Sequence, residues 1–560
     1  MEDRGKRRMK KPIFPTALED DTAGARSVPR RSVVLSSAYL VPAAVVALML
    51  LYFVDPNPRL DFSAFDTRDA ESYVALSQSL VDGRGYTRSL DPQFYIPHTT
   101  WPPGLPILLT PFVALAGIPL SLLVVKLGMI AYGAAGILLA YLYARRLSRS
   151  PLVQLAVPFL LGLDPYYWQF SRMTDSEMPT VLWALVALLL ADIGWAKGEI
   201  RHRTAFLFGL VAGFGMAIRA SFAAAVLLPL IYLVALRVER TDWRCDGPRY
   251  LAYAVGFILP FAAWVTRNRF IDTHGLGQDG INQLAMFFRT LPVDPASSLR
   301  TLSQTLADMR TTLATGAIYE IPQALVPGLW SKAPWLSLGA AAAPLAIALS
   351  LAAILVSFLS RRNLPLIVLY GSLAAINVFY AAGSMPRLWV PVTCLVLISL
   401  PFGAEKLARS WPRRLTGGAT AALVAALAAS LALYIVRHDR FPYHDQAYAA
   451  LASLFESIRS HDQVPGNVLT PNPQAFGLYT GLKAPVPVPG IGIDPEYAYA
   501  VLPSAEWDDK KLPGKLLEHN DVWSFIALDT PLRIDEFRRR YDCANAVIPA
   551  MSAVSNCLIF

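Results

Sequence analysis

The sequence predicts a polytopic α-helical membrane protein that carries a small α/β domain at its C-terminal end. Of the 560 residues, 54% are hydrophobic and the mean hydropathy is +0.40, which is more apolar surface than one soluble core can bury. About eleven segments reach the roughly 20 mostly apolar residues that a membrane span requires. Lysine and arginine cluster in the short stretches between these segments, and always on the same side of the membrane.

Each predicted span is a run of mostly apolar residues bounded by polar or charged ones. The spans lie near residues 33–54, 119–145, 151–169, 177–196, 204–218, 221–238, 249–267, 337–359, 364–382, 388–405 and 416–436. A single charged residue, Arg219, separates the two short spans in the middle of this series.

The orientation follows from the basic residues. They gather in the N-terminal tail and at Arg145, Arg146, Arg149, Lys197, Arg201, Arg203, Arg237, Arg240, Arg244, Arg361, Arg362, Lys406, Arg409, Arg413 and Arg414. Positively charged segments stay in the cytosol, so residues 1–32 are expected to form a cytoplasmic basic tail. The odd number of spans in 33–436 then places 437–560 outside, together with the loops 55–118, 170–176 and 268–336. The net charge of +9 reflects this asymmetry, and no nucleic-acid partner is predicted.

The segment 437–560 has the composition of a soluble domain. An amphipathic helix is predicted at 445–460, strands at 466–470 and 523–529, and a last helix near 532–541. The four cysteines show no metal-binding spacing. Cys543 and Cys557 both lie in this external segment. They can form a disulfide or remain two free thiols, and the sequence does not decide between these alternatives.

The first external loop combines acidic residues with a helical pattern. Asp66, Asp69 and Glu71 follow the first span, and Asp69 is followed at helical spacing by Tyr73, Leu76 and Leu80. A Gly-Arg-Gly-Tyr turn and a rigid Trp-Pro-Pro-Gly-Leu-Pro segment, which begins at Trp101, come next. Acidic residues at a membrane surface can simply belong to a solvated turn. Here they coincide with the helical pattern and the rigid proline segment, which indicates a functional loop.

A second acidic group, Asp175 and Glu177, lies in the short loop between the third and fourth predicted spans. Ionisable groups at membrane depth are costly and therefore mark candidate functional sites. The alternative is a helix N-terminus, with Thr174 or Asp175 as the N-cap and Glu177 in the first turn. The two roles are compatible.

Arginines stand at the outer ends of later spans. Arg219, Arg267 and Arg387 can each snorkel to the interface, which is the common role of a single arginine. Three of them on one face with two acidic groups favour binding of a phosphate, because the guanidinium group is planar and permanently charged. Lys126 and His98 are weaker candidates for the same task.

The order D-x-x-x-Y, L-x-x-G-x-G-Y and W-P-P-G-x-P resembles the first external loop of the GT-C membrane glycosyltransferases. The nearest branch is similar to the bacterial protein-mannosyltransferases and aminoarabinose transferases, which take sugars from polyprenyl-phosphate carriers. The resemblance implies a GT-C-like fold over 33–436 in a bacterial cytoplasmic (inner) membrane. It also implies a polyprenyl-phosphate sugar donor and a glycan, lipid or protein acceptor.

The resemblance implies roles for individual residues as well. Asp69 matches the catalytic aspartate, and the second acid is Asp175 in one branch and Glu177 in another, a choice that the sequence leaves open. Arg267 and Arg387 match arginines of the family and become the donor phosphate-binding candidates, with Arg219 and Lys126 beside them. The residues expected to support the structure of the first loop are Asp66, Tyr73 and Trp101.

This chain departs from the family in one motif, and the pattern leaves a divalent cation open. The aminoarabinose branch has Glu-Lys-Pro-Pro where this chain has Thr100-Trp101-Pro102-Pro103, so that branch's substrates are not carried over. No cofactor is required by the pattern, but two carboxylates beside a phosphate suit Mg²⁺ or Mn²⁺, and Asp69 and Asp175 would be the ligands of such a divalent cation.

Two other classes compete with a glycosyltransferase. A lipid or solute transporter or flippase also has many spans and intramembrane charges, but it places them near the midplane, whereas these charges gather at helix ends beside two long loops. A non-catalytic assembly protein would leave the paired acidic loops without a role. No P-loop, dinucleotide-binding glycine motif or histidine metal pattern is present.

Overall fold

The computed structural model describes part of the chain. The described residues are 68–87, 97–117, 122–196, 200–236, 241–273, 288, 298–326, 339–379, 386–410, 425, 446–459, 466–469, 476, 478, 480, 482, 497–503, 514–519 and 523–532. Outside them lie the expected span at 33–54, the expected span at 416–436 except for residue 425, the residue Asp66, the expected final helix near 532–541 after its first residue, and the cysteines 543 and 557.

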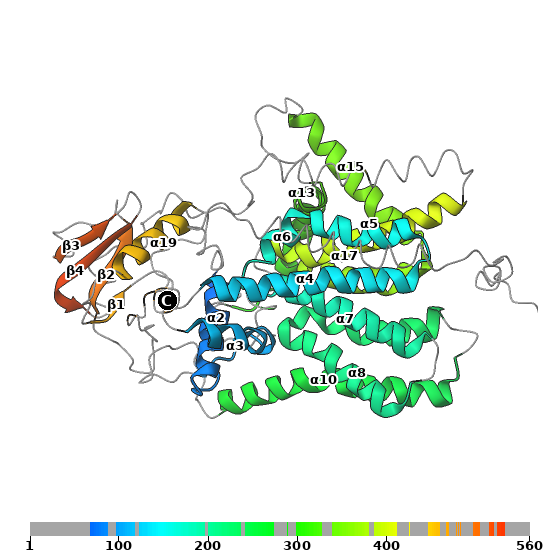
Figure 1. Ribbon diagram of the computed structural model, residues 1–560, viewed down its shortest axis with the longest axis horizontal. Coiled ribbons are helices and arrows are strands. Elements are labelled where there is room, and N and C mark those ends of the chain that lie inside the picture. Colours follow the sequence, from blue (N-terminus) through cyan, green and yellow to red (C-terminus); the bar gives the residue numbers. More distant parts are fainter. Residues whose placement is uncertain are drawn as a thin grey trace, which may run out of the picture.

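Long helices that run side by side form the body of the protein (Figure 1). The helices are α4 (Leu122–Leu147), α5 (Pro151–Leu163), α6 (Pro165–Phe170), α7 (Glu177–Trp195), α8 (His202–Ile218), α10 (Trp243–Thr273), α15 (Gly339–Phe358), α16 (Leu364–Phe379) and α17 (Pro386–Ser410). Helix α17 lies at the centre, where 94% of its most apolar 18-residue stretch is buried. Large apolar side chains such as Leu207, Leu251 and Leu355 are exposed on the outer helices, which suits a surrounding of lipid.

Five helices in the described part of the chain are long and apolar enough to cross a membrane. They are Leu123–Leu147, Glu177–Trp195, Trp243–Ile271, Arg361–Phe379 and Arg387–Arg409, and shorter apolar helices include Gly104–Ala116, Pro151–Leu163, His202–Ile218, Ala220–Leu236 and Pro344–Phe358. The mostly helical membrane fold is therefore confirmed. The count of eleven spans stays a prediction.

One predicted span is not a uniform α-helix. Within the expected span 221–238, the described residues up to Leu236 form a 3₁₀ helix, η2 (Ala220–Leu227), a short α9 (Leu228–Ile231) and a π-helical turn, η3 (Tyr232–Leu236). Pro229 lacks the backbone N–H that would continue the α-helical ladder at this place, which explains the irregular winding.

Polar contacts join one end of the bundle, where α4 and α17 carry basic residues and α7 carries Asp192. Arg146 of α4 forms an ion pair with Asp192 of α7, and Arg409 pairs with Glu405 of α17 at 2.7 Å. Ser148 donates a hydrogen bond to Glu405 at 2.8 Å, so α17 is also tied to the end of α4. This is the end that the charge pattern predicts to face the cytosol.

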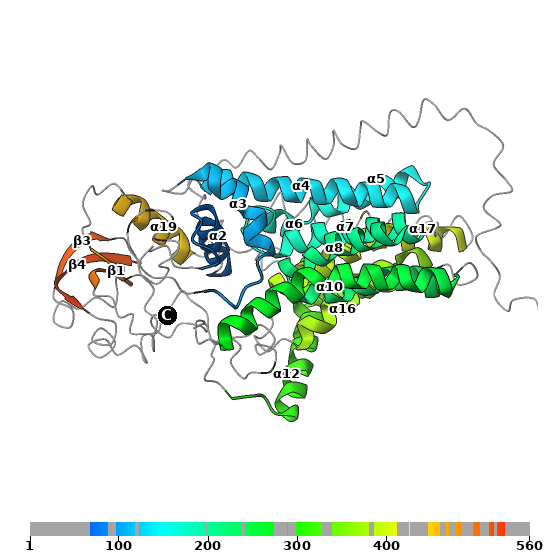
Figure 2. The same cartoon turned by 90° about the horizontal axis from the view of Figure 1, so that it is seen from below.

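The opposite end carries the first loop. Helices α2 (Arg68–Val81) and α3 (Gly104–Ala116) lie there, between the long helices and a small sheet (Figures 1 and 2). The helical spacing around Asp69 is thus confirmed by α2, whose apolar face buries Tyr73, Val74 and Leu76. Tyr86 donates to the carbonyl of Trp101 at 2.9 Å and folds the turn after α2 against the Trp-Pro-Pro segment.

Gly104, the glycine of the Trp-Pro-Pro-Gly segment, lets α3 touch the backbone of α8. A Cβ built on Gly104 would lie 2.5 Å from backbone atoms of Ala217 and Ile218, closer than any real Cβ contact. Arg219 is the next residue after this contact. The loop motif therefore has a physical reason, because only glycine allows α3 to begin directly on the end of α8.

Gly104→Ala is expected to lower the stability of the detergent-solubilised protein by about 1–3 kcal/mol, since neither backbone can yield without moving a helix. Thermal unfolding measures the change. Gly371→Ala is the matched control, because a Cβ on this helical glycine of α16 meets no atom within 4 Å. Equal unfolding temperatures for the two variants would contradict the close contact.

A four-stranded sheet lies beyond the loop helices. Its strands are β1 (Val468–Leu469), β2 (Tyr497–Pro503), β3 (Gly514–His519) and β4 (Trp523–Leu532), in the order β1-β2-β4-β3. β1 pairs with β2 in parallel, whereas β4 pairs with β2 and β3 in antiparallel orientation. Helix α19 (Gln446–Arg459) contributes Phe455 to a buried cluster that also contains Val74 of α2 and Phe525 of β4. The sheet is thus packed onto the first loop.

Helix α12 (Leu302–Thr315) stands out from the side of the bundle (Figure 2). It begins with a capping box between Thr301 and Gln304, is continued by η5 (Gly316–Glu320) and α13 (Ile321–Leu325), and exposes Leu302, Leu306 and Leu313. The short η6 (Arg361–Asn363) precedes α16. An exposed leucine row on a helix of the loop 268–336 suits a helix that lies at the membrane interface.

Candidate active site

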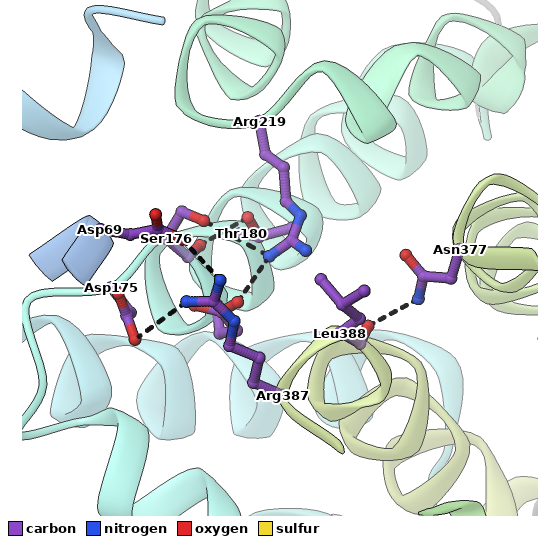
Figure 3. Close-up of polar contacts among 9 residues, drawn as sticks. Asp69, Asp175, Ser176, Thr180, Arg219, Asn377, Arg387 and Leu388 are labelled. Atoms are coloured by element: carbon purple, nitrogen blue, oxygen red, sulfur yellow. Dashed lines mark hydrogen bonds and ion pairs between the residues drawn. The ribbon is translucent and has the colours of Figure 1, made fainter. Parts of the chain in front are cut away.

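Five charged side chains from five parts of the chain meet at the end of the bundle that carries α2, and Figure 3 labels four of them. We call them the charge cluster: Asp69 of α2, Asp175 of the loop after α6, Glu177 of α7, Arg219 between α8 and η2, and Arg387 of α17. The sequence proposed all five, but as members of separate motifs. The fold brings the two acidic loops and two of the three candidate arginines into direct contact.

Arg387 bridges the two acidic loops. Its Nη2 donates to Oδ2 of Asp69 at 2.6 Å, and its Nη1 lies 3.9 Å from Oδ2 of Asp175 (Figure 3). The Asp69 and Arg387 side chains are 22% and 21% exposed, whereas Asp175 is only 1% exposed. A ligand that approaches the charge cluster from solvent therefore meets the Asp69–Arg387 pair first.

The start of α17 is fixed by a polar contact from the neighbouring helix. Asn377 of α16 donates from Nδ2 to the carbonyl of Leu388 at 2.6 Å, and its side chain is buried. This bond holds the first turn of α17 and thereby the position of Arg387. Sequence reasoning missed Asn377, although a polar amide inside an apolar span was a visible signal.

Arg219 and Glu177 form the second, more buried ion pair. Arg219 Nη1 lies 2.9 Å from Oε1 of Glu177, and the two side chains are 16% and 3% exposed. The backbone of Arg219 is extended, with φ −153° and ψ 122°, so α8 ends here and the side chain turns toward α7. Arg219 also donates to Ser176 Oγ at 3.3 Å, and Ser176 is a contact that sequence reasoning missed.

Tyr73 lies one helical turn after Asp69 on α2 and is 4% exposed. Burial raises the pKa of its phenol well above the ordinary value, and the charges of Asp69, Glu177 and Asp175 raise it further, while Arg219 lowers it. The hydroxyl group is therefore protonated at neutral pH. Tyr73 brings a hydrogen-bond donor without charge to the acidic side of the charge cluster.

The loop before α7 is attached to α2 rather than capping α7. Thr174 donates from Oγ1 to the carbonyl of Ala70 at 3.2 Å. The N-cap of α7 is Ser176, whose side chain makes no capping bond, so the alternative in which Thr174 or Asp175 caps this helix is wrong. Tertiary packing against α2 takes the threonine away from the helix end, while Glu177 keeps its expected place in the first turn of α7.

Arg267, the third candidate arginine, lies in an aromatic setting at the end of α10. Its guanidinium carbon is 4.9 Å from the ring centre of Trp264 and 5.6 Å from that of Tyr86. Its Nη1 donates to the carbonyl of His98 at 2.9 Å. Arg267 thus fastens the loop that precedes the Trp-Pro-Pro segment. The ring of Trp101 lies 6.0 Å from that of Tyr73 and continues this aromatic group toward the charge cluster.

The remaining candidates are placed less directly. Lys126 is buried near the start of α4, 6% exposed, and His98 is buried with its Nε2 accepting a hydrogen bond from the backbone N–H of Trp101 at 2.9 Å. His98 therefore supports the loop that Arg267 holds.

A divalent cation between Asp69 and Asp175 was an open possibility of the sequence. Within the part of the chain that the structure describes, no group of three or more histidine, cysteine, aspartate or glutamate side chains is arranged to hold a metal ion. The guanidinium of Arg387 already supplies positive charge to both of these carboxylates. The described side chains alone therefore form no metal site, and a cation held by these two carboxylates together with a donor phosphate stays a prediction.

Comparisons with known proteins show what this chain resembles. The sequence model of a family described as dolichyl-phosphate-mannose-protein mannosyltransferase matches residues 100–265, which is less than half of the chain. No curated protein matches the sequence.

Solved structures extend the likeness to most of the chain. ArnT from Cupriavidus metallidurans bound to undecaprenyl phosphate is similar with a TM-score of 0.52 and 13% identity, over 87% of this chain and 97% of that chain. Its apo state gives a TM-score of 0.50 and 12% identity, over 89% and 98%. These matches show a common fold. The resemblance to GT-C glycosyltransferases of the ArnT and protein-mannosyltransferase type, predicted from the first loop, is therefore confirmed.

Proposed function

We propose that this protein is a membrane glycosyltransferase that moves a sugar from a polyprenyl-phosphate donor to a hydroxyl group of an envelope glycan, lipid or protein. The observation that carries the proposal is the accessible pair of Asp69 and Arg387, a carboxylate next to a guanidinium at the entrance of the charge cluster. A transferase of this kind needs both groups in one place, one for the proton of the acceptor and one for the phosphate of the donor. The match to the mannosyltransferase family and the ArnT-like fold support the same reaction class.

The reaction that suits the site is a direct displacement. The acceptor oxygen attacks the anomeric carbon of the sugar, its proton passes to the carboxylate of Asp69, and the bond between that carbon and the phosphate oxygen breaks. The polyprenyl phosphate leaves with the bonding electrons, and Arg387 stabilises the added negative charge. A single displacement inverts the configuration at the anomeric centre.

The other residues of the charge cluster hold this arrangement. The buried Glu177–Arg219 pair fixes the start of α7, and Asp175 lies where it can orient the acceptor from the opposite loop. The neutral hydroxyl of Tyr73 can donate to a sugar oxygen without adding charge. Arg267, on the neighbouring aromatic group, is our second candidate for the donor phosphate.

The decisive experiment for the function is a transfer assay with purified protein in lipid nanodiscs. Radiolabelled polyprenyl-phosphate sugars are supplied with envelope extracts, and label is followed from the lipid into a water-soluble or lipid acceptor. Lipid-linked sugars that accumulate in a deletion strain identify which donor to use. If the protein carries the lipid or the sugar across the membrane of sealed vesicles without cleaving the donor, it is a transporter and the proposal is wrong.

The catalytic face is expected to be external. A phosphatase reporter fused after Phe560 should be active only outside the cytosol, because the basic ends of the helices are retained inside and the number of predicted spans is odd. A cytosol-dependent reporter at the same position provides the opposite readout. Activity of the cytosol-dependent reporter alone would reverse the topology and put the charge cluster on the other face.

A further inference from the structure

Asp69 and Arg387 have separate tasks in the proposed reaction, yet they are bound to each other. The base must be open to an acceptor hydroxyl group, and the arginine must be open to a phosphate. The 2.6 Å contact occupies Nη2 of the guanidinium with the carboxylate of Asp69, and Nη1 faces Asp175. Both terminal nitrogens of Arg387 are thus directed at carboxylates.

A phosphate and a carboxylate compete for the same face of a guanidinium. Both accept hydrogen bonds from the N–H groups in the plane of the guanidinium. An N–H group that donates to a carboxylate is therefore not available to a phosphate. The charge cluster holds three carboxylates and two guanidinium groups, so its formal charge is negative before a donor binds. A phosphate that approaches Arg387 therefore adds negative charge to an already anionic cluster, which favours replacement of a carboxylate over binding beside it.

We propose that the donor phosphate displaces Asp69 from Arg387, so that donor binding and release of the catalytic base are one event. This inference rests on the proposed function. The Asp69–Arg387 contact is the one that exchanges, because the Asp69 side chain is 22% exposed and can be reached by a ligand, whereas that of Glu177 is 3% exposed. The Glu177–Arg219 pair is more deeply buried and stays closed.

The exchange gives Asp69 a defined state before and after the donor arrives. Without donor, its Oδ2 is engaged by Arg387. With the phosphate in place, the carboxylate is free to turn toward the acceptor, while Asp175, 3.9 Å from Nη1, keeps the guanidinium oriented. An acceptor is then deprotonated only when a donor sugar is present to receive it. Departure of the polyprenyl phosphate restores the pair.

The test is binding of undecaprenyl phosphate to the full-length protein in nanodiscs, followed by a double-mutant cycle. Asp69→Asn should bind the lipid about 2–5-fold more tightly than the parent, because the competing carboxylate is gone. In the Arg387→Gln background the same substitution should leave the dissociation constant unchanged. If Asp69 acts only by charge repulsion, Asp69→Asn should tighten lipid binding in both backgrounds. That result would overturn the exchange.

The matched control is Asp82→Asn. Asp82 follows α2 and pairs with Arg84 at 2.6 Å, so the substitution removes the same charge from the same type of pair. Asp82 lies thirteen residues after Asp69, which is about 20 Å along the helix. Its removal should not change the dissociation constant. Asp69→Ser removes the carboxylate in a second way, in case Asp69→Asn does not fold.

The outcomes separate the two proposals. If the parent does not bind undecaprenyl phosphate and transfers no sugar, the proposed function fails and the exchange falls with it. If the parent binds the lipid and transfers sugar, but Asp69→Asn binds no more tightly, the function stands and the exchange is wrong. Tighter binding that disappears in the Arg387→Gln background supports the exchange.

Discussion

Asp69→Asn is expected to lower the rate of sugar transfer by about 10²–10⁴-fold, because the acceptor hydroxyl loses the carboxylate that takes its proton. Asparagine has nearly the same shape, so α2 and the loop around it should stay folded. Initial rates in the nanodisc transfer assay, at saturating donor, measure the effect. The protein should still bind its donor, so the loss falls on kcat rather than on KM.

The control for this prediction is again Asp82→Asn, which removes a carboxylate paired with arginine at the far end of α2 and should retain nearly parental activity. Asp66→Asn tests the neighbouring acid of the same loop and should lose much less than Asp69→Asn. Near-parental transfer by Asp69→Asn would remove this residue from catalysis and would raise the transporter alternative.

Arg387→Ala is expected to lower transfer by about 10²–10³-fold, since the charge that develops on the leaving phosphate loses its partner. Asp175, which is 1% exposed, also loses the guanidinium beside it. Some destabilisation should therefore accompany the loss of activity. Arg387→Lys separates the two effects, because it keeps the charge but not the planar fork, and should recover stability more than activity.

Arg409→Ala is the matched control for Arg387→Ala. Arg409 lies in the last turn of the same helix and pairs with Glu405 at 2.7 Å, but it is 52% exposed and at the opposite end of the bundle. Its substitution should change transfer by less than about 2-fold, as expected for an exposed pair. Equal losses for the two arginine variants would show that α17 needs charge for folding and not for phosphate binding.

Local patterns allowed much of the fold to be predicted. The spacing of Asp69 and Tyr73 predicts α2, and the apolar run before Arg145 predicts α4, because both signals are contained in one helix. The strands β2 and β3 were not predicted. β2 is rich in alanine and ends in Pro503, and β3 contains Lys515 and Glu518, so neither has the apolar alternation that marks a strand.

The arrangement of the candidate site was less accessible to prediction. Each member of the charge cluster was found from its own motif, but the pairing of Asp69 with Arg387 joins positions 318 residues apart. No local pattern encodes such a contact, since it depends on how α2 and α17 end at the same place. The same holds for Gly104, whose need for close contact with α8 is visible only when both backbones are placed.

The long separation of Asp69 and Arg387 also bears on how the protein is made. At a synthesis rate of about 5–20 residues per second, Asp69 leaves the ribosome roughly 15–60 s before Arg387. By the end of that interval the nascent chain carries α2 and both acidic loops, but not the arginine that completes them. A polypeptide that terminates before Pro386 is therefore expected to be inert, so incomplete copies in the membrane cannot consume lipid-linked sugar.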